Sequence, residues 1–97
     1  MKIPKDIKIG GIVYDIEFVN EINDDIHNAE YSGRVIYKNS KIKILGSYPV
    51  ERQFRTLLHE IIHIIDEDLK IGFEENAICR LEAGLFGVLK DNNLLKE

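Results

Sequence analysis

The sequence has few of the residues that stabilise small domains by covalent or metal cross-links. It contains one cysteine, Cys79, which excludes an intrachain disulfide framework and a cysteine-rich zinc site and fits a reducing compartment. Tryptophan is absent, prolines number two, and no internal repeat or low-complexity tract is visible. The 97 residues therefore predict one compact domain, residues 1–97, whose core comes from the 44% of residues that are hydrophobic.

Long hydrophobic runs and clusters of positive charge are also missing. The longest apolar run, residues 57–65, is interrupted by His59, Glu60 and His63 and is far shorter than the roughly 20 residues of a membrane span. Charged and apolar residues are mixed at the start of the sequence, which is unlike a signal peptide. Thirteen Lys and Arg against seventeen Asp and Glu give a net charge of −4. We therefore expect a cytoplasmic protein that binds neither nucleic acid nor a membrane.

The first part of the chain has the composition and period of short antiparallel β-strands. Residues 5–9 and 12–19 are rich in β-branched and aromatic residues, and the Gly-Gly pair between them supplies the positive φ of a tight hairpin turn. Residues 34–38 and 41–45 form a second predicted strand pair, and apolar and charged residues alternate in its second strand. The segment 20–30, rich in Asn and Asp, is predicted to be an exposed loop.

After residue 46 the hydrophobic period becomes that of α-helices. One apolar stripe predicts a helix that begins near Pro49 and ends by Gly72; its members are Phe54, Leu57, Leu58, Ile61, Ile62, Ile65 and Leu69. A second helix is predicted over residues 73–90, with a stripe formed by Ile78, Leu81, Leu85, Val88 and Leu89. The fold class is therefore α+β, with a β layer in residues 1–46 and a two-helix layer in residues 47–97.

The first predicted helix contains the motif H-E-x-x-H at residues 59–63. Positions i and i+4 lie about one turn apart on the same helix face, so His59 and His63 can bind one metal ion. Glu60 is then placed to take a proton from a water molecule on that metal. Two solvated histidines at the edge of a helix are the simpler alternative, but polar residues gather around His59 on a face separate from the apolar stripe.

A catalytic zinc site takes three protein ligands and keeps a fourth position for water, so the motif needs a third ligand. Residues 64–69 lack the glycine and histidine of a metzincin motif, and no histidine follows His63. The remaining candidates are Glu74, Glu75, Glu82, Cys79 and His27. A carboxylate of the second helix is the economical choice, because a short connection makes the two helices neighbours. Cys79 is more often a small buried apolar residue than a ligand.

The motif and its surroundings resemble a known family, the small prophage-encoded metallopeptidases of the ImmA/IrrE-like gluzincin group. The similarity lies in residues 56–63, 74–75, 81–85 and 88–92, and also in the N-terminal strand segments 3–11 and 14–19. It implies a minimal zincin-like fold in which short N-terminal antiparallel strands precede the motif helix and a C-terminal helix.

The same resemblance implies a ligand set. Zn²⁺ would be bound by His59, His63 and a glutamate of the next helix, with Glu60 as the base. The position that matches the family's glutamate is Glu75, although Glu74 stays open because it points more nearly along the apolar stripe. A thermolysin-like aspartate four residues after the ligand is absent, because Cys79 occupies that position, so another group must orient the histidines.

These observations predict a zinc-dependent metalloendopeptidase of a phage or other mobile element, a hydrolase with an extended peptide of an unidentified protein as its substrate. Relatives that cleave repressors suggest a regulator protein as the target, and a partner protein could supply specificity. The substrate backbone would pair with the strand at 34–38 or at 41–45. Residues that could stabilise an oxyanion are His27, Tyr31, Tyr37, Tyr48 and Arg52, and the sequence favours none of them.

The alternative function is a non-catalytic, zinc-stabilised protein-interaction module of a mobile element. Small size favours it, because the chain has no visible specificity module. Glu60 argues against it, because a structural zinc site has no use for a base and usually closes its fourth position with protein.

Overall fold

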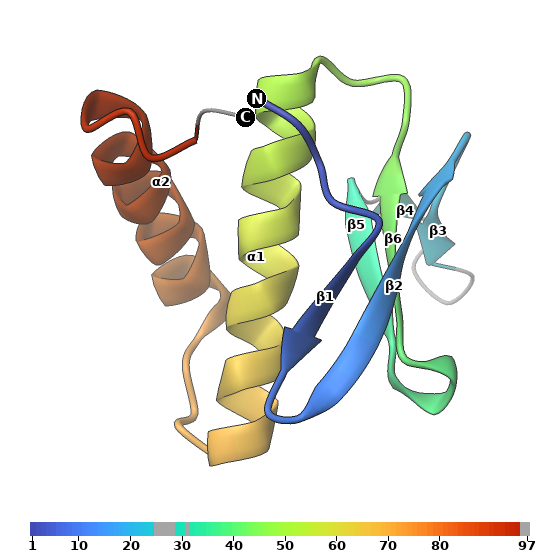
Figure 1. Ribbon diagram of the computed structural model, residues 1–97. Coiled ribbons are helices and arrows are strands. Elements are labelled where there is room, and N and C mark those ends of the chain that lie inside the picture. The colour runs from blue at the N-terminus through green and yellow to red at the C-terminus, as the bar shows by residue number, and fades with distance from the viewer. Residues whose placement is uncertain (25–28, 31, 96–97) are drawn as a thin grey trace.

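The computed structural model describes residues 1–24, 29–30 and 32–95, and within residues 23–24 and 29–30 only the backbone. It has an α+β fold in which a four-stranded mixed sheet and two long helices form successive layers (Figure 1). Helix α1, Val50–Leu69, lies between the sheet and helix α2, Glu75–Asp91. The predicted fold class, with strands first and helices second, is therefore confirmed.

The N-terminal hairpin forms as the sequence predicts. Strand β1, Asp6–Ile9, pairs antiparallel with strand β2, Ile12–Val19. Gly10 and Gly11 form the turn with φ of 57° and 85°, values that only glycine adopts at low cost.

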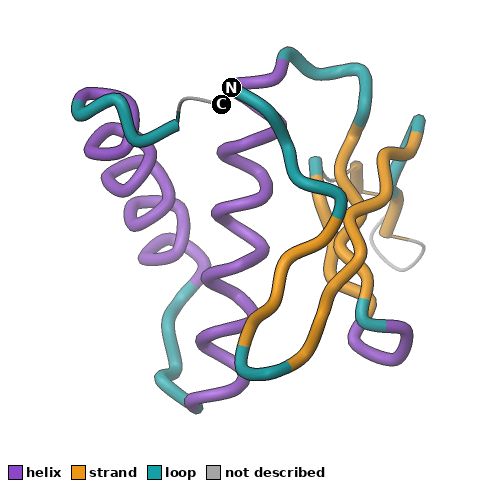
Figure 2. The backbone as a smooth tube through the Cα atoms, in the orientation of Figure 1, coloured by secondary structure: helices purple, strands orange, loops and turns teal. Residues whose placement is uncertain are grey.

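The second predicted strand pair also forms, with a short helix in its turn. Strand β5, Gly33–Ile36, pairs antiparallel with strand β6, Lys41–Leu45, and the 3₁₀ helix η1, Tyr37–Asn39, connects them. Strand β6 also pairs in parallel with β2, so the order across the sheet is β1-β2-β6-β5. Strand β6 is thus internal, and β5 is an edge strand. The strands, orange in Figure 2, lie on the side of α1 away from α2.

The segment predicted as an exposed loop is more ordered than that. Strand β3, Asn23–Asp24, and strand β4, Ala29–Glu30, form a small separate antiparallel pair, and Ile22 just before them is 5% exposed. The prediction of a loop across 20–30 was therefore wrong at these positions, because a buried side chain anchors a segment whose composition favours turns. His27 and Tyr31 lie outside the described residues.

The core lies between the sheet and α1. Its buried members are Tyr14, Ile42, Ile44, Leu57 and Ile64. The alternation predicted for β6 is confirmed, because Ile42 and Ile44 are both completely buried. Two fully or nearly fully buried side chains of α1, Leu57 and Ile64, lie two turns apart and cover this face of the sheet.

The apolar stripe predicted for the second helix is confirmed at Ile78 but wrong at most of its other positions. Leu81, Leu85 and Val88 are exposed by 40%, 45% and 56%, whereas Ile78 and Phe86 are the buried residues of α2. Helix α2 is rotated so that a more polar face meets α1. Within the described residues, no helix is long and apolar enough to cross a membrane.

The connection between the helices fixes where α2 begins. Helix α1 ends at Leu69, and Lys70 takes the left-handed conformation with φ of 53°. The Asp66 carboxylate then accepts hydrogen bonds from the backbone N–H groups of Gly72 and Phe73, at 2.7 and 3.0 Å. These bonds hold the short connection against the end of α1 and so set the position of Glu75, the first residue of α2.

Candidate metal centre

The structure places His59 and His63 side by side on α1, at the face that meets α2. Their Nε2 atoms are 3.2 Å apart, and their ring centroids are 4.9 Å apart. This follows from the i, i+4 spacing on a regular helix. Both imidazoles therefore direct a ring nitrogen toward the same point.

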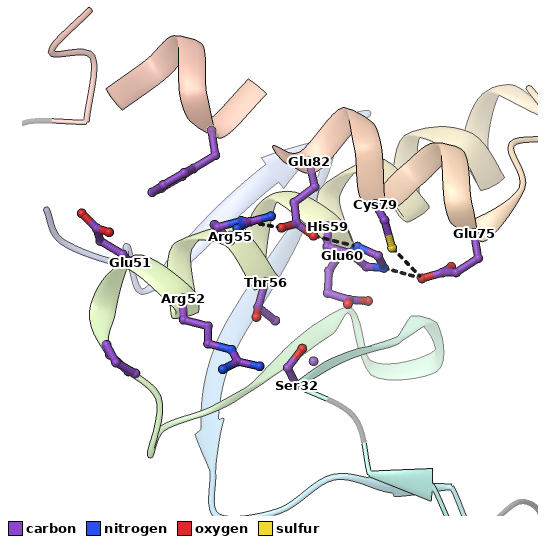
Figure 3. A pocket seen from close by; sticks show the side chains of 13 residues that line it. Ser32, Glu51, Arg52, Arg55, Thr56, His59, Glu60, Glu75, Cys79 and Glu82 are labelled. Atoms are coloured by element: carbon purple, nitrogen blue, oxygen red, sulfur yellow. Dashed lines mark hydrogen bonds and ion pairs between the residues drawn. The ribbon is translucent and has the colours of Figure 1, made fainter. Parts of the chain in front are cut away.

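Glu75 reaches that point from α2. One carboxylate oxygen, Oε1, lies 2.7 Å from Nε2 of His59 (Figure 3). The other, Oε2, lies 3.0 Å from Nε2 of His63. Glu74 is the N-cap residue of α2, is exposed, and lines neither cavity at the centre. Of the two glutamates that the sequence left open, the structure brings Glu75 to the histidines.

Glu82 lies on the same face of α2, two turns after Glu75, and contacts the far side of His59. Its Oε1 is 3.1 Å from Nδ1 of His59, and its Oε2 accepts a hydrogen bond of 2.7 Å from Nε of Arg55. The sequence suggested Glu82 only as a ligand; here it orients a histidine instead. The spacing of seven residues from Glu75 was the available signal for this role.

These contacts leave an electrostatic problem at the centre. When Nδ1 of His59 donates to Glu82, a neutral imidazole has no proton on Nε2, and that nitrogen then faces the Glu75 carboxylate with a lone pair. Two acceptors 2.7 Å apart repel each other unless a proton or a cation lies between them. The arrangement therefore needs a proton between these two atoms or a bound cation.

Glu60 is buried beside this centre. It is 7% exposed and makes no hydrogen bond or ion pair within the described part of the chain, yet it lines the cavities on both sides of His59. Its pKa is raised to about 7, chiefly by burial; His59 lowers the pKa, and the acidic groups of Glu75 and Glu82 raise it. A carboxyl with a pKa near neutrality can both accept and return a proton.

Gly33 allows strand β5 to approach α1 at this position. A Cβ atom there would lie 2.4 Å from Cγ2 of Thr56 and 3.2 Å from Oε2 of Glu60, so no larger residue fits without displacement. Glycine at 33 therefore brings the edge strand directly beside the Glu60 carboxylate. No pattern in the sequence singles out Gly33, because a close approach between distant segments leaves no local signal.

A cavity of about 750 Å³ extends from the centre along α1 between β5 and α2. The residues that line it include Ser32, Arg52, Arg55, Cys79 and Phe86 (Figure 3). Of the suggested oxyanion groups, the Arg52 guanidinium lines this cavity and stacks 4.2 Å from the centroid of the Tyr48 ring. Tyr37 lines a second cavity, which adjoins the first at His59, Glu60 and Gly33.

Cys79 is the remaining candidate ligand, and it is exposed rather than buried. Its Sγ atom is 4.0 Å from Oε1 of Glu75. Partial desolvation by the cavity walls raises the pKa of its thiol, as do the carboxylates of Glu75 and Glu82. The expectation that Cys79 is a small buried apolar residue is therefore wrong, because α2 directs position 79 into the cavity.

Comparisons of the chain with known proteins gave no match. No family model fits it, and no curated protein and no solved structure is significantly similar to it.

Proposed function

We propose that the protein is a zinc-dependent metallopeptidase, with His59, His63 and Glu75 as metal ligands and Glu60 as the catalytic base. The convergence of two imidazole nitrogens and one carboxylate within 3.2 Å of one another carries this proposal. The resemblance to the ImmA/IrrE-like group agrees with it.

The donor set suits zinc in its chemistry and spacing. Histidine nitrogen and glutamate oxygen are common zinc ligands, and two donors of one tetrahedral ion lie about 3.4 Å apart when each bond is about 2.1 Å. The Nε2 atoms of the two histidines are 3.2 Å apart, and Glu75 is slightly closer to each of them. A cation between them also removes the repulsion of acceptor atoms described above. The residues present therefore fit a zinc site with three protein ligands.

Glu82 supports this site from outside. A zinc ligand histidine usually donates its other ring N–H to a carboxylate or carbonyl, which fixes the tautomer and the ring orientation. Glu82 accepts from Nδ1 of His59 in this manner and is itself held by Arg55. It thus replaces the aspartate that a thermolysin-like pattern would place at position 79.

Zinc held by these ligands would polarise a peptide carbonyl and lower the pKa of a water molecule bound beside it. The Glu60 carboxylate would accept a proton from that water and later deliver it to the leaving amine. Its near-neutral pKa suits both transfers. Its low exposure, with no hydrogen bond or ion pair to another described residue, suits a base that acts on a group bound in the cavity.

An extended peptide is the substrate class that the surrounding fold suits. Strand β5 is an edge strand beside Glu60 and could add a substrate strand by backbone hydrogen bonds. Pairing with β6, the other possibility raised by the sequence, is excluded because β6 already pairs on both sides. The regulator protein and the mobile-element origin remain expectations from the resemblance.

The test combines metal content with the Glu60→Gln variant. Natively purified protein should contain close to one zinc per chain, and the variant should keep its zinc because Glu60 is not a ligand. Zinc-loaded wild-type protein should cleave members of a peptide library, and the variant should cleave them about 10² to 10⁴ times more slowly.

Two results would decide against this proposal in different ways. If neither protein binds zinc, the metal centre is wrong. If both bind zinc and neither cleaves any peptide or host protein, the zinc-stabilised interaction module is the better description of the chain.

A further inference from the structure

Cys79 lies closer to the proposed metal centre than its position in sequence suggests. It follows Glu75 by one turn on the same face of α2, and its side chain points into the cavity toward the Glu75 carboxylate (Figure 3). One ligand atom from each of His59, Glu75 and Cys79 can be chosen so that all three lie within 4.8 Å of one another. The thiol is thus at the edge of the space that a metal ion would occupy.

Little movement would bring this sulfur to the metal. A zinc–sulfur bond is about 2.3 Å long, so sulfur and nitrogen ligands of one tetrahedral ion lie about 3.6 Å apart. The present separations exceed that value by about 1 Å at most. Cys79 is exposed, so its side chain can rotate without disturbing the core, while α2 keeps its backbone in place.

A second feature of the same cavity indicates that it binds a ligand. The Glu60 carboxyl, 7% exposed and without a hydrogen bond or ion pair among the described residues, faces the same space. None of the described side chains leaves a fully buried oxygen or nitrogen without a partner, so the Glu60 oxygens open onto this cavity and would be satisfied by what occupies it. The cysteine therefore borders a site that is built for a ligand and is not an isolated surface thiol.

We propose that Cys79 is a reversible fourth ligand of the metal, which closes the site when no substrate is bound. This inference rests on the proposed metal centre and adds a resting state to it. In the closing step the thiol loses its proton to solvent, the thiolate sulfur bonds to the metal, and one water molecule leaves the fourth position. Opening reverses each of these changes.

Closure has a direct functional consequence. Catalytic zinc sites keep their fourth position for water, whereas structural sites fill it with protein. With sulfur bound, the site has the composition of a structural centre, and Glu60 has no water to deprotonate. A peptide paired with β5 would have to displace the thiolate before hydrolysis could begin.

Cobalt substitution tests this proposal without any need for a substrate. Co²⁺ added to the metal-free full-length chain should give an intense near-ultraviolet sulfur-to-cobalt charge-transfer band at one equivalent. Cys79→Ser should lose that band while keeping the weaker visible bands of a cobalt site with nitrogen and oxygen ligands. Glu60→Gln, which changes the same cavity but leaves the thiol, is the matched control and should keep the band.

A second measurement follows the thiol itself. Iodoacetamide should alkylate Cys79 in the metal-free protein at least about tenfold faster than in the zinc-loaded protein. Alkylated wild-type protein should then bind Co²⁺ without the charge-transfer band, which repeats the result of Cys79→Ser in a chain that has already folded.

The outcomes distinguish a failure of the Cys79 proposal from a failure of the proposed metallopeptidase function. Co²⁺ bound with no charge-transfer band in the wild-type protein would overturn the role of Cys79 and leave the three-ligand site intact. A band that persists in Cys79→Ser would overturn it in the same way. Failure of the wild-type protein to bind Co²⁺ or Zn²⁺ at all would overturn both proposals.

Discussion

The two faces of α1 differ in how they hold the molecule together. Toward the sheet, α1 buries apolar side chains such as Leu57 and Ile64 in a core with the strands. Toward α2 it presents Arg55, His59 and His63, which meet carboxylates of α2. Apolar burial stabilises the fold whatever is bound, but clustered acceptors are favourable only when a cation or proton joins them. The side toward the sheet is thus almost wholly apolar, whereas the side toward α2 combines the Phe54–Phe86 contact with a cluster of acceptors. On the proposed function, that cluster makes part of the stability depend on a bound metal.

The largest expected loss of stability comes from removing apolar packing between α1 and the sheet. Ile64 is completely buried, so Ile64→Ala should lower the free energy of unfolding by about 2 to 5 kcal/mol. Urea denaturation followed by circular dichroism measures this change, and Leu81→Ala, on the exposed side of α2, is the control with little expected loss. Equal losses in both variants would show that the core is not where the structure places it.

Removing the metal tests the face of α1 that meets α2. At a free zinc concentration about one hundred times its dissociation constant, zinc should add about 2.7 kcal/mol to the stability of the folded chain. Chelation should therefore lower the melting temperature but leave a folded protein, because the core with the sheet contains no ligand. Amide hydrogen exchange should rise mainly in α2. Complete unfolding on chelation would contradict the division between the two faces.

The pH dependence of the stability of the metal-free protein also tests the difference between the two faces of α1. The pKa of Glu60 rises from 4.5 to about 7 on folding, chiefly through burial, so between these values the folded chain keeps a proton that the unfolded chain releases. Its stability should consequently fall as pH rises through this window, by roughly 2 kcal/mol. Glu60→Gln should remove this dependence and be more stable than wild type at pH 8 in chelator. Thermal melts at pH 5 and pH 8 measure the stability of both proteins. The same change in melting temperature for wild type and Glu60→Gln would contradict the burial of the Glu60 carboxyl.

The smallest effects concern residues outside the ligand set. Glu82→Gln should weaken zinc binding about 10- to 100-fold, because the amide orients His59 less strongly than the carboxylate does. Glu74→Gln is its matched control and should change affinity little, since Glu74 only precedes α2. Competition with a zinc chelator measures both affinities. A larger loss from Glu74 would show that the ligand is misassigned by one residue.

The features that the sequence predicted are those with local causes. The Gly-Gly hairpin, the β5–β6 pair and both helices follow from turn chemistry and hydrophobic period. The i, i+4 spacing likewise brought His59 and His63 together. The parallel pairing of β2 with β6 joins segments far apart in the chain, and no local pattern encodes it.

The orientation of α2 shows why the rest could not be predicted. The most regular apolar stripe was expected to be buried, yet Leu81 and Leu85 face outward. The face that meets α1 carries Glu75, Cys79 and Glu82, which a hydrophobic pattern would assign to solvent. Helix α2 also buries Ile78 and Phe86, so it combines apolar and charged contacts, and periodicity does not detect the charged partners.

The missing side chain at Gly33 has a consequence for how the protein could measure its substrate. Because the strand rests directly on Thr56 and Glu60 there, the distance from the β5 edge to the base is fixed by backbone rather than by a flexible side chain. A peptide added to this edge could shift only in steps of two residues while keeping its hydrogen bonds. Cleavage sites would therefore follow the register of the peptide on β5. Gly33 would define that register relative to the Glu60 carboxylate.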